Sequence, residues 1–209
     1  MQERLPLFPL NNVVYPGEPL NLHIFEPRYI ELINDVLASD GIFGMPVFMG
    51  VKLDYGTTLM ITKVEKIYGD GRMDIKTVGM KVFRVKKLEN PAEGKLYSAG
   101  DIEYVDDVEN GTYENVAALK RYIKDVLVRL DLKKDVQIRS EVKSFNVAHL
   151  AGLSQAKKYE LLTIDNEKDR QEYLIHHFEK LLPILEGLHE TKARVMMNGH
   201  FKNFDPLNF

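Results

Sequence analysis

The sequence changes its pattern near residue 107, and this change constrains the fold more than any other feature. From residue 5 to about residue 107, short apolar runs are broken by Pro and Gly, which is typical of strands and turns. After Asn110-Gly111 the apolar residues recur at helical spacing. We therefore predict a β-rich region at 1–107 and an α-helical region at 108–209, joined by a short Gly-containing hinge at 107–113.

Five or six short strands are predicted in the first region, including runs at 42–48, 58–67 and 98–105. The strongest hairpin signal is Asp70-Gly71, because Gly tolerates the positive φ that such turns need. We expect the turn at 68–72 to lead into a strand at 73–78. Gly79 is expected to form another turn before a strand at 81–88. Consecutive short strands of this kind predict an antiparallel barrel or sandwich.

One helix is predicted to interrupt the strands. Pro27 suits a first helical position, because its missing N–H would have no partner there. Ile30, Ile33 and Leu37 follow at helical spacing, and Gly41 fits a helix stop. The apolar stripe of this helix should cover one open end or face of the strands.

The second region has several helical patterns. One face of a helix of about 16 residues is predicted by an apolar set at Val116, Leu119, Ile123, Val126 and Leu130. Ser154 and Asn166 suit the N-caps of two more helices. The last helix has a regular apolar seam at Leu174, Phe178, Leu181, Leu185 and Leu188. Pro183 lies inside it and removes one backbone hydrogen bond, a cost of about 3 kcal/mol, so we expect a kink there.

Composition excludes several classes of protein. The 209 residues contain no Cys, so there is no disulfide framework, thiolate nucleophile or Cys-based metal site. The net charge of −3 gives no global attraction to nucleic acid or anionic lipid. No apolar run approaches the roughly 18 residues that span a bilayer. The N-terminus lacks a signal-peptide pattern, so we expect a cytoplasmic protein without a membrane partner.

Motifs for catalysis, cofactors and metals are missing from the sequence. Gly94-Lys95 lacks the earlier Gly of a phosphate-binding loop, and Gly69-Asp70-Gly71 lacks the third Gly of a dinucleotide site. Glu172 and His176 share a helix face and could hold half a metal site, but a solvated face explains them better. No Ser lies in a nucleophile elbow. We therefore predict no catalytic residue, no cofactor and no metal, although unrecognised carboxylates such as Asp106-Asp107 leave an enzyme open.

A basic cluster occupies the predicted strand at 81–88, at Lys81, Arg84, Lys86 and Lys87. Small β-barrels can bind RNA, so nucleic-acid binding is one interpretation. The alternating Val82, Phe83, Val85 and Leu88 instead fit a strand with one buried face and one charged, edge-protecting face. We favour the second interpretation.

The most informative segment is 5–29, LPLFPLNNVVYPGEPLNLHIFEPRY. It closely resembles the opening of the LON N-terminal, or substrate-binding, domain, and in particular the stand-alone form of that family. Downstream, Gly56-Thr57, Asp70-Gly71-Arg72 and the segment 78–85 resemble further family motifs, and 157–162 and 170–182 match its helical part in pattern. Val82 replaces the usual Arg before Phe83, which puts in doubt whatever that Arg supports.

The resemblance implies an α+β fold: a PUA-like antiparallel β pseudo-barrel with one inserted helix, followed by a C-terminal helical bundle. The residues that carry the resemblance are expected to be mainly structural: Pro6, Leu7, Phe8, Pro9, Leu10, Pro16, Gly17, Phe25, Glu26, Pro27, Arg28, Tyr29, Asp70, Gly71, Arg72, Gly79 and Phe83. Glu26 and Arg28 are expected to pair with each other or with nearby backbone rather than to bind a ligand.

The resemblance also implies a function. In full-length Lon proteases this region helps to engage substrate and to organise the hexamer, and the ATPase and Ser-Lys peptidase domains follow it. With no such motifs here, we expect a non-enzymatic polypeptide-binding module, an adaptor or sensor in protein quality control whose partners are polypeptide substrates or a proteolysis or chaperone protein. Peptide could add to an open barrel edge or lie between the two regions.

The C-terminal tail, 201–209, contains Phe201, Phe204 and Phe209. These side chains are candidates for packing on the protein's own core or for docking into a partner. Two alternative functions remain: an RNA-binding PUA-like protein, by fold analogy alone, and a small-molecule sensor, as the LON-related protein cereblon pairs such a domain with a ligand-binding one.

Overall fold

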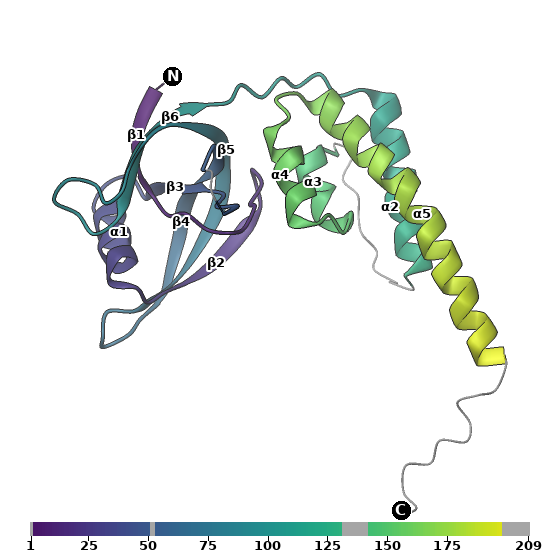
Figure 1. Ribbon diagram of the computed structural model, residues 1–209, viewed down its shortest axis with the longest axis horizontal. Helices are drawn as coiled ribbons and strands as arrows, with labels where there is room; N and C mark the ends of the chain where they lie inside the picture. The colour runs from purple at the N-terminus through teal and green to yellow at the C-terminus, as the bar shows by residue number, and fades with distance from the viewer. Residues whose placement is uncertain (1, 51–52, 131–141, 198–209) are drawn as a thin grey trace, which may run out of the picture.

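The computed structural model describes residues 2–50, 53–130 and 142–197, and the side chains within these ranges up to residue 187, Gln2 excepted. Figure 1 shows strands gathered at the N-terminal end and helices at the C-terminal end. In chain order the elements are β1 (Gln2–Leu7), β2 (Pro19–Ile24), α1 (Pro27–Leu37), β3 (Ile42–Pro46), β4 (Tyr55–Ile67), β5 (Met73–Glu89), β6 (Ser98–Tyr104), α2 (Tyr113–Arg129), α3 (Ser144–Val147), a 3-10 turn (Ala148–Leu150), α4 (Gln155–Thr163) and α5 (Glu167–Met197).

The strands form one mixed sheet that closes on itself. Their order is β2-β5-β4-β3-β1-β6, and β6 also pairs with β5. The closed ring is therefore β5-β4-β3-β1-β6, while β2 pairs only with the first half of β5, from Met73 to Val78. The α+β class and the barrel followed by helices are confirmed. One pair departs from the antiparallel prediction, because β1 lies parallel to β3.

Gly79 is not a turn, contrary to the sequence prediction. β5 runs without interruption from Met73 to Glu89 and passes Gly79 in its middle. A Cβ at Gly79 would lie 2.2 Å from the Tyr15 carbonyl oxygen, and its N–H donates to the Glu18 carbonyl at 2.9 Å. This glycine therefore allows another backbone segment to approach closely inside a strand. In the sequence alone, such a glycine looks the same as one that forms a turn.

The hairpin prediction at 68–72 is confirmed. Gly71 has φ +87° and donates its N–H to the Tyr68 carbonyl at 3.0 Å. Asp70 accepts hydrogen bonds from the Arg72 backbone N–H at 3.2 Å and from its Nε at 2.7 Å. The turn residues thus connect β4 to β5 directly.

Helix α1 covers the barrel as expected, beginning at Pro27 and burying Leu32, Ile33 and Val36. Together with residues from the barrel, these form one apolar cluster. Near its start, Phe8 stacks on Tyr29 with ring centroids 3.9 Å apart.

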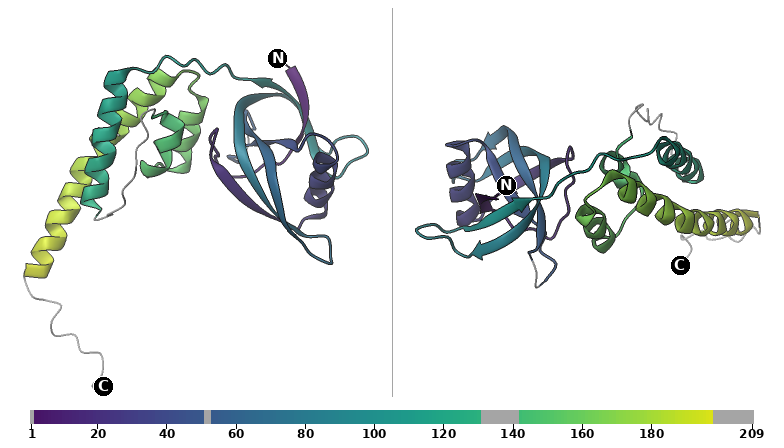
Figure 2. Two further views of the ribbon diagram at one scale, coloured as in Figure 1. Left: turned by 180° about the vertical axis from the view of Figure 1, so that it is seen from behind. Right: turned by 90° about the horizontal axis from the view of Figure 1, so that it is seen from above.

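The helical region pairs α2 with α5, and both extend away from the barrel (Figures 1 and 2). Thr112 caps α2 and Ser154 caps α4. The Asn166 side chain accepts the Asp169 N–H at 2.9 Å, as a cap of α5 should. α5 continues through Pro183 as a single helix, so the proline does not divide it.

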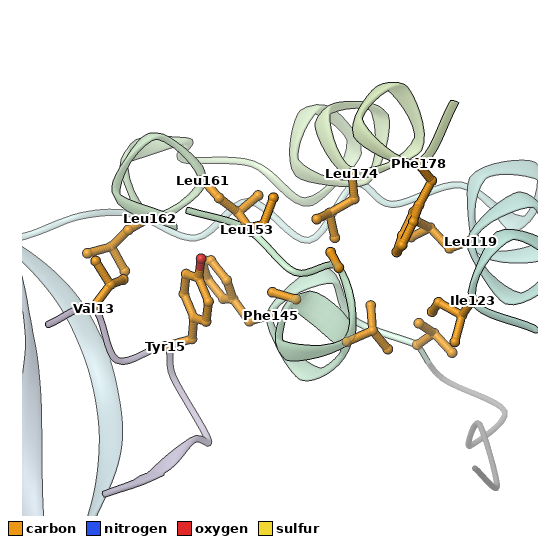
Figure 3. Close-up of a cluster of buried hydrophobic side chains, with 14 of the residues drawn as sticks. Val13, Tyr15, Leu119, Ile123, Phe145, Leu153, Leu161, Leu162, Leu174 and Phe178 are labelled. Carbon is orange, nitrogen blue, oxygen red and sulfur yellow. The ribbon is translucent and has the colours of Figure 1, made fainter. Parts of the chain in front are cut away.

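The helical core reaches into the barrel region. Figure 3 shows Val13 and Tyr15 facing Leu161, Leu162 and Phe145. Tyr15 stacks on Phe145 at 5.0 Å, and its hydroxyl donates to the Lys158 carbonyl at 3.1 Å. The two regions therefore share one apolar cluster, and the domain boundary at 107 stays a prediction.

Candidate functional site

Most residues of the N-terminal motif are buried or partly buried and shape the barrel. Leu7 and Phe83 are fully buried in one cluster. The Leu7 side chain packs directly against Gly44: a Cβ added to Gly44 would lie only 2.6 Å from it. Pro6, Pro9, Leu10 and Pro16 are partly buried, and Gly17 takes φ +81° in the turn before β2. These positions hold strands together and present no chemistry to solvent.

The motif also has an exposed end, where Phe25 and Arg28 are exposed and Glu26 is partly buried. Phe25 is 60% exposed at the end of β2. Arg28 contacts Glu26 at 2.7 Å and lies over the Tyr29 ring at 4.5 Å. The expected pairing of Glu26 with Arg28 is therefore present, and Phe25 remains as an exposed apolar group beside the β2 strand.

The outer edge of β2 carries backbone groups without a partner strand in the described part of the chain. Gly79 N–H donates to the Glu18 carbonyl, and the Thr77 hydroxyl donates to the Leu20 carbonyl. Bonded and non-bonded pairs alternate in an antiparallel ladder. The register Asn21↔Lys76 and His23↔Asp74 therefore directs the backbone N–H and C=O of Asn21 and His23 away from β5. We call these two residues the β2 edge.

An aromatic strip, Phe25, His23 and Tyr68, borders the β2 edge. The His23 ring lies 5.9 Å from both Phe25 and Tyr68. His23 Nδ1 and the Tyr68 hydroxyl both bond Asp74, at 2.6 and 2.8 Å, and these hydrogen bonds lower the pKa of that carboxyl. Ile67, which directly precedes Tyr68 in the sequence, is 66% exposed. Apolar surface therefore lies next to free strand-pairing groups.

A cavity of about 410 Å³ lies in the helical region, between the start of α2 and the start of α5. Its wall includes Glu167, Arg170 and Gln171, which are 6%, 3% and 1% exposed. Glu167 accepts hydrogen bonds from the Ser144 N–H at 2.7 Å and from its hydroxyl at 2.8 Å. The carboxylate thereby fixes the start of α3 to the start of α5.

Arg170 completes this network. Its guanidinium contacts Glu167 at 3.1 Å, pairs with Asp107 of the linker and donates to the Ile164 carbonyl at 2.9 Å. Gln171 donates to Glu167 at 3.1 Å and accepts the Thr112 N–H at 3.2 Å. The buried polar groups of the cavity are thus committed to one another, and we interpret the network as a structural clamp.

The family model for the ATP-dependent protease La (LON) substrate-binding domain matches residues 4–180, which is most of the chain. The chain belongs to the LON substrate-binding domain family.

Two solved structures resemble this LON domain. A Lon N-terminal domain protein from Xanthomonas campestris is 26% identical and superposes with a TM-score of 0.61, covering 83% of this chain and 98% of its own. The N-terminal domain of Mycobacterium avium complex Lon protease has a TM-score of 0.65 at 18% identity, covering 85% and 98%. The second likeness shows the fold alone.

Two curated relatives are longer than this chain. A LON peptidase N-terminal domain and RING finger protein of Schizosaccharomyces pombe is 24% identical over 210 residues, covering 79% of this chain and 43% of that protein. Protein cereblon of Danio rerio is 29% identical over 101 residues, covering 44% and 23%. The chain thus spans less than half the length of either relative.

Basic side chains on the strand at 81–88 of this LON domain contact nearby residues of the barrel. Lys81 lies 5.3 Å from the Tyr104 ring centroid, Arg84 lies 4.9 Å from that of Tyr55, and Lys86 pairs with Glu103 at 3.0 Å. Phe83 is buried beneath them. These contacts agree with the interpretation of 81–88 as a barrel strand with a charged outer face.

The described residues were also compared with the other kinds of site considered from the sequence. Across residues 2–50, 53–130 and 142–197, no group of three or more His, Asp or Glu residues could hold a metal ion. His176 pairs with Glu179, at 3.6 Å, rather than with Glu172. None of the helices that the structure describes could cross a membrane. The candidate Phe residues 201, 204 and 209 lie outside the described residues.

Sequence reasoning missed the β2 edge and the clamp. Pro19 followed by alternating Leu20, Leu22 and Ile24 is the signal that could have suggested an edge strand, because Pro in sheets is found on edge strands, at the first residue of a strand or at bulges. Glu167 and Arg170 are spaced three residues apart, like ordinary surface pairs on a helix, so their burial had no signature in the sequence.

Proposed function

We propose that this LON domain is a non-catalytic module that binds extended polypeptide and acts as an adaptor or sensor in ATP-dependent proteolysis. The observation that carries the proposal is the β2 edge. Its backbone donors and acceptors can pair with an added strand, and alternate side chains of that strand would then meet the flanking surface. Membership of a substrate-binding family supports the same conclusion.

The aromatic strip would add affinity to backbone pairing. A strand placed against Asn21 and His23 brings its side chains beside the His23 ring, the exposed Phe25 and the partly buried Leu20 and Leu22. Burial of apolar surface is worth about 25 cal/mol per Å² before the entropy of ordering the segment is subtracted. We therefore expect weak, exchangeable binding, which suits transfer of a substrate to another protein.

The test is a titration of the full chain with a permanently unfolded, fluorescently labelled polypeptide, followed by anisotropy. Asn21→Pro removes an N–H that faces away from β5, so it should block strand addition while leaving the barrel folded. Asn21→Ala retains that N–H and is the matched control. We expect Asn21→Pro to weaken binding at least about tenfold, equivalent to about 1.4 kcal/mol, with Asn21→Ala near wild type.

Equal binding by both variants would overturn the assignment to the β2 edge. Absence of binding by the wild-type chain, at concentrations where a Lon N-domain binds the same polypeptide, would overturn the polypeptide-binding function itself. Circular dichroism of each variant confirms that the barrel has folded.

A further inference from the structure

A half-buried histidine, His177, joins three parts of the helical region. It lies on α5, its Nε2 is 2.8 Å from the Ala151 carbonyl oxygen, and its Nδ1 is 3.1 Å from the Lys157 Nζ. Ala151 follows the 3-10 turn, and Lys157 lies on α4. The imidazole is therefore one of the polar contacts that hold α4 and the preceding turn on α5, beside the Tyr173 hydroxyl of α5, which bonds the Lys157 carbonyl at 3.3 Å.

These two partners define the protonation state of the ring. A carbonyl oxygen only accepts, so Nε2 must carry a hydrogen and donate it. A lysine ammonium only donates, so Nδ1 must offer a lone pair. The neutral tautomer with its proton on Nε2 satisfies both contacts. Protonation of Nδ1 would remove the acceptor and turn an N–H towards the ammonium of Lys157.

The charges around the ring oppose protonation. Lys157 approaches from α4 and Lys180 lies on α5, while the segment after the 3-10 turn contributes the neutral Ala151 carbonyl. Glu160, the carboxylate of α4, accepts a hydrogen bond from the Tyr173 hydroxyl at 2.7 Å. Burial, followed by these two lysines, lowers the pKa of His177, and the Ala151 contact opposes this only in part.

We propose that His177 is an acid-sensitive latch: its neutral ring strengthens the packing of α4 on α5, and its protonation loosens α4. The consequence extends to the barrel, because α4 supplies part of the contacts between the two regions. The Tyr15 hydroxyl bonds the Lys158 carbonyl, and Tyr159 packs edge-on to Tyr55 at 6.2 Å. Loosening of α4 would therefore weaken these contacts between the barrel and the helices.

The sign of the pH dependence follows from the lowered pKa. The unfolded chain binds a proton near pH 6.5, the ordinary value for His, while the folded chain resists it to lower pH. The latch therefore contributes fully above about pH 6.5. Its contribution is lost as the pH falls from there through the lower pKa of the folded state.

Hydrogen exchange of the full chain between pH 7.5 and pH 5.5 tests the latch, with NMR used to follow the titration of His177. We expect the protection factors of α4 amides to fall relative to those of β3, by about tenfold for each unit by which the pKa is lowered. His177→Gln retains a donor and an acceptor but cannot titrate, so the pH-dependent loss should vanish. His176→Gln, at the exposed neighbouring position, is the matched control and should retain the loss.

Unchanged α4 protection through the titration of His177, or a loss that persists in His177→Gln, would overturn the latch. If His177→Gln fails to fold, Lys157→Met tests the proposal instead. Without the facing ammonium, the pKa of His177 should rise and the loss of protection should become smaller. An undiminished loss in Lys157→Met would contradict the proposal.

Discussion

The barrel closes around apolar side chains and glycines that allow close backbone contact, whereas the start of the helical region closes around buried charge. In the barrel, Phe83 is fully buried and Gly79 touches the Tyr15 carbonyl. In the helical region, Glu167 and Arg170 are almost fully buried and bind the linker and α3 to α5. Apolar packing tolerates small adjustments, but a buried charge that loses its partner has no substitute. The two regions should therefore respond differently to substitution.

The largest effect is expected from Arg170→Met. This change leaves the Glu167 carboxylate buried without its cation, and breaking such a pair costs about 3–5 kcal/mol. Chemical denaturation of the full chain measures the loss. The double variant Glu167→Gln, Arg170→Met should recover part of it, because no buried charge then remains and the amide oxygen can still accept a hydrogen bond from Ser144. A double variant less stable than Arg170→Met would show that the clamp does not depend on charge pairing.

Gly79→Ala should rank second, with a loss of about 3 kcal/mol from overpacking in the barrel. The added Cβ would meet the Tyr15 carbonyl at 2.2 Å, so two backbone segments must separate. Gly69→Ala is the control, because nothing lies within 4 Å of a Cβ there. Thermal unfolding compares the two variants. Similar midpoints would contradict the close backbone approach and restore the interpretation of Gly79 as a turn.

Tyr15→Phe tests the joint between the two regions. It removes the hydrogen bond to the Lys158 carbonyl but keeps the ring stacked on Phe145. We expect a loss of about 1 kcal/mol in the free energy of unfolding, the usual net value of such a bond. In hydrogen exchange, the protection of α4 amides should fall more than that of β3 amides. A uniform change across both regions would mean that the joint does not open separately.

The smallest effect is expected from Arg28→Gln. The pair with Glu26 is exposed on both sides, and exposed ion pairs contribute at most about 1 kcal/mol, often nothing measurable. We therefore predict no change in the denaturation midpoint beyond error. A loss comparable to that of Arg170→Met would show that the exposed end of the motif is as important as the buried clamp.

Much of the barrel could be predicted from the sequence because its turns depend on residues with unusual backbone properties. Pro27 and Gly71 mark a helix start and a hairpin by their own φ preferences, and both predictions are confirmed. Gly79 was interpreted wrongly for the same reason: a glycine that permits close contact and one that permits a turn have the same sequence signature. The parallel pairing of β1 with β3 depends on long-range closure, which local patterns do not report.

The candidate site was only partly predictable. The family motif points to the end of β2, where Phe25 is exposed. It does not reveal that, among the described residues, no strand pairs with Asn21 and His23 on the side facing away from β5. That property depends on β6 and β2 sharing one side of β5, an arrangement visible only in the folded sheet. Likewise, the burial of Arg170 depends on the linker returning across the start of α5.

The central claim is that extended polypeptide pairs with the β2 edge. Amide hydrogen exchange of Asn21 and His23, measured with and without saturating unfolded polypeptide, tests it most directly. The account predicts that both amides become protected on binding, because an added strand would accept their N–H groups. Protection confined to the helical region, with the Asn21 and His23 amides unchanged, would contradict it.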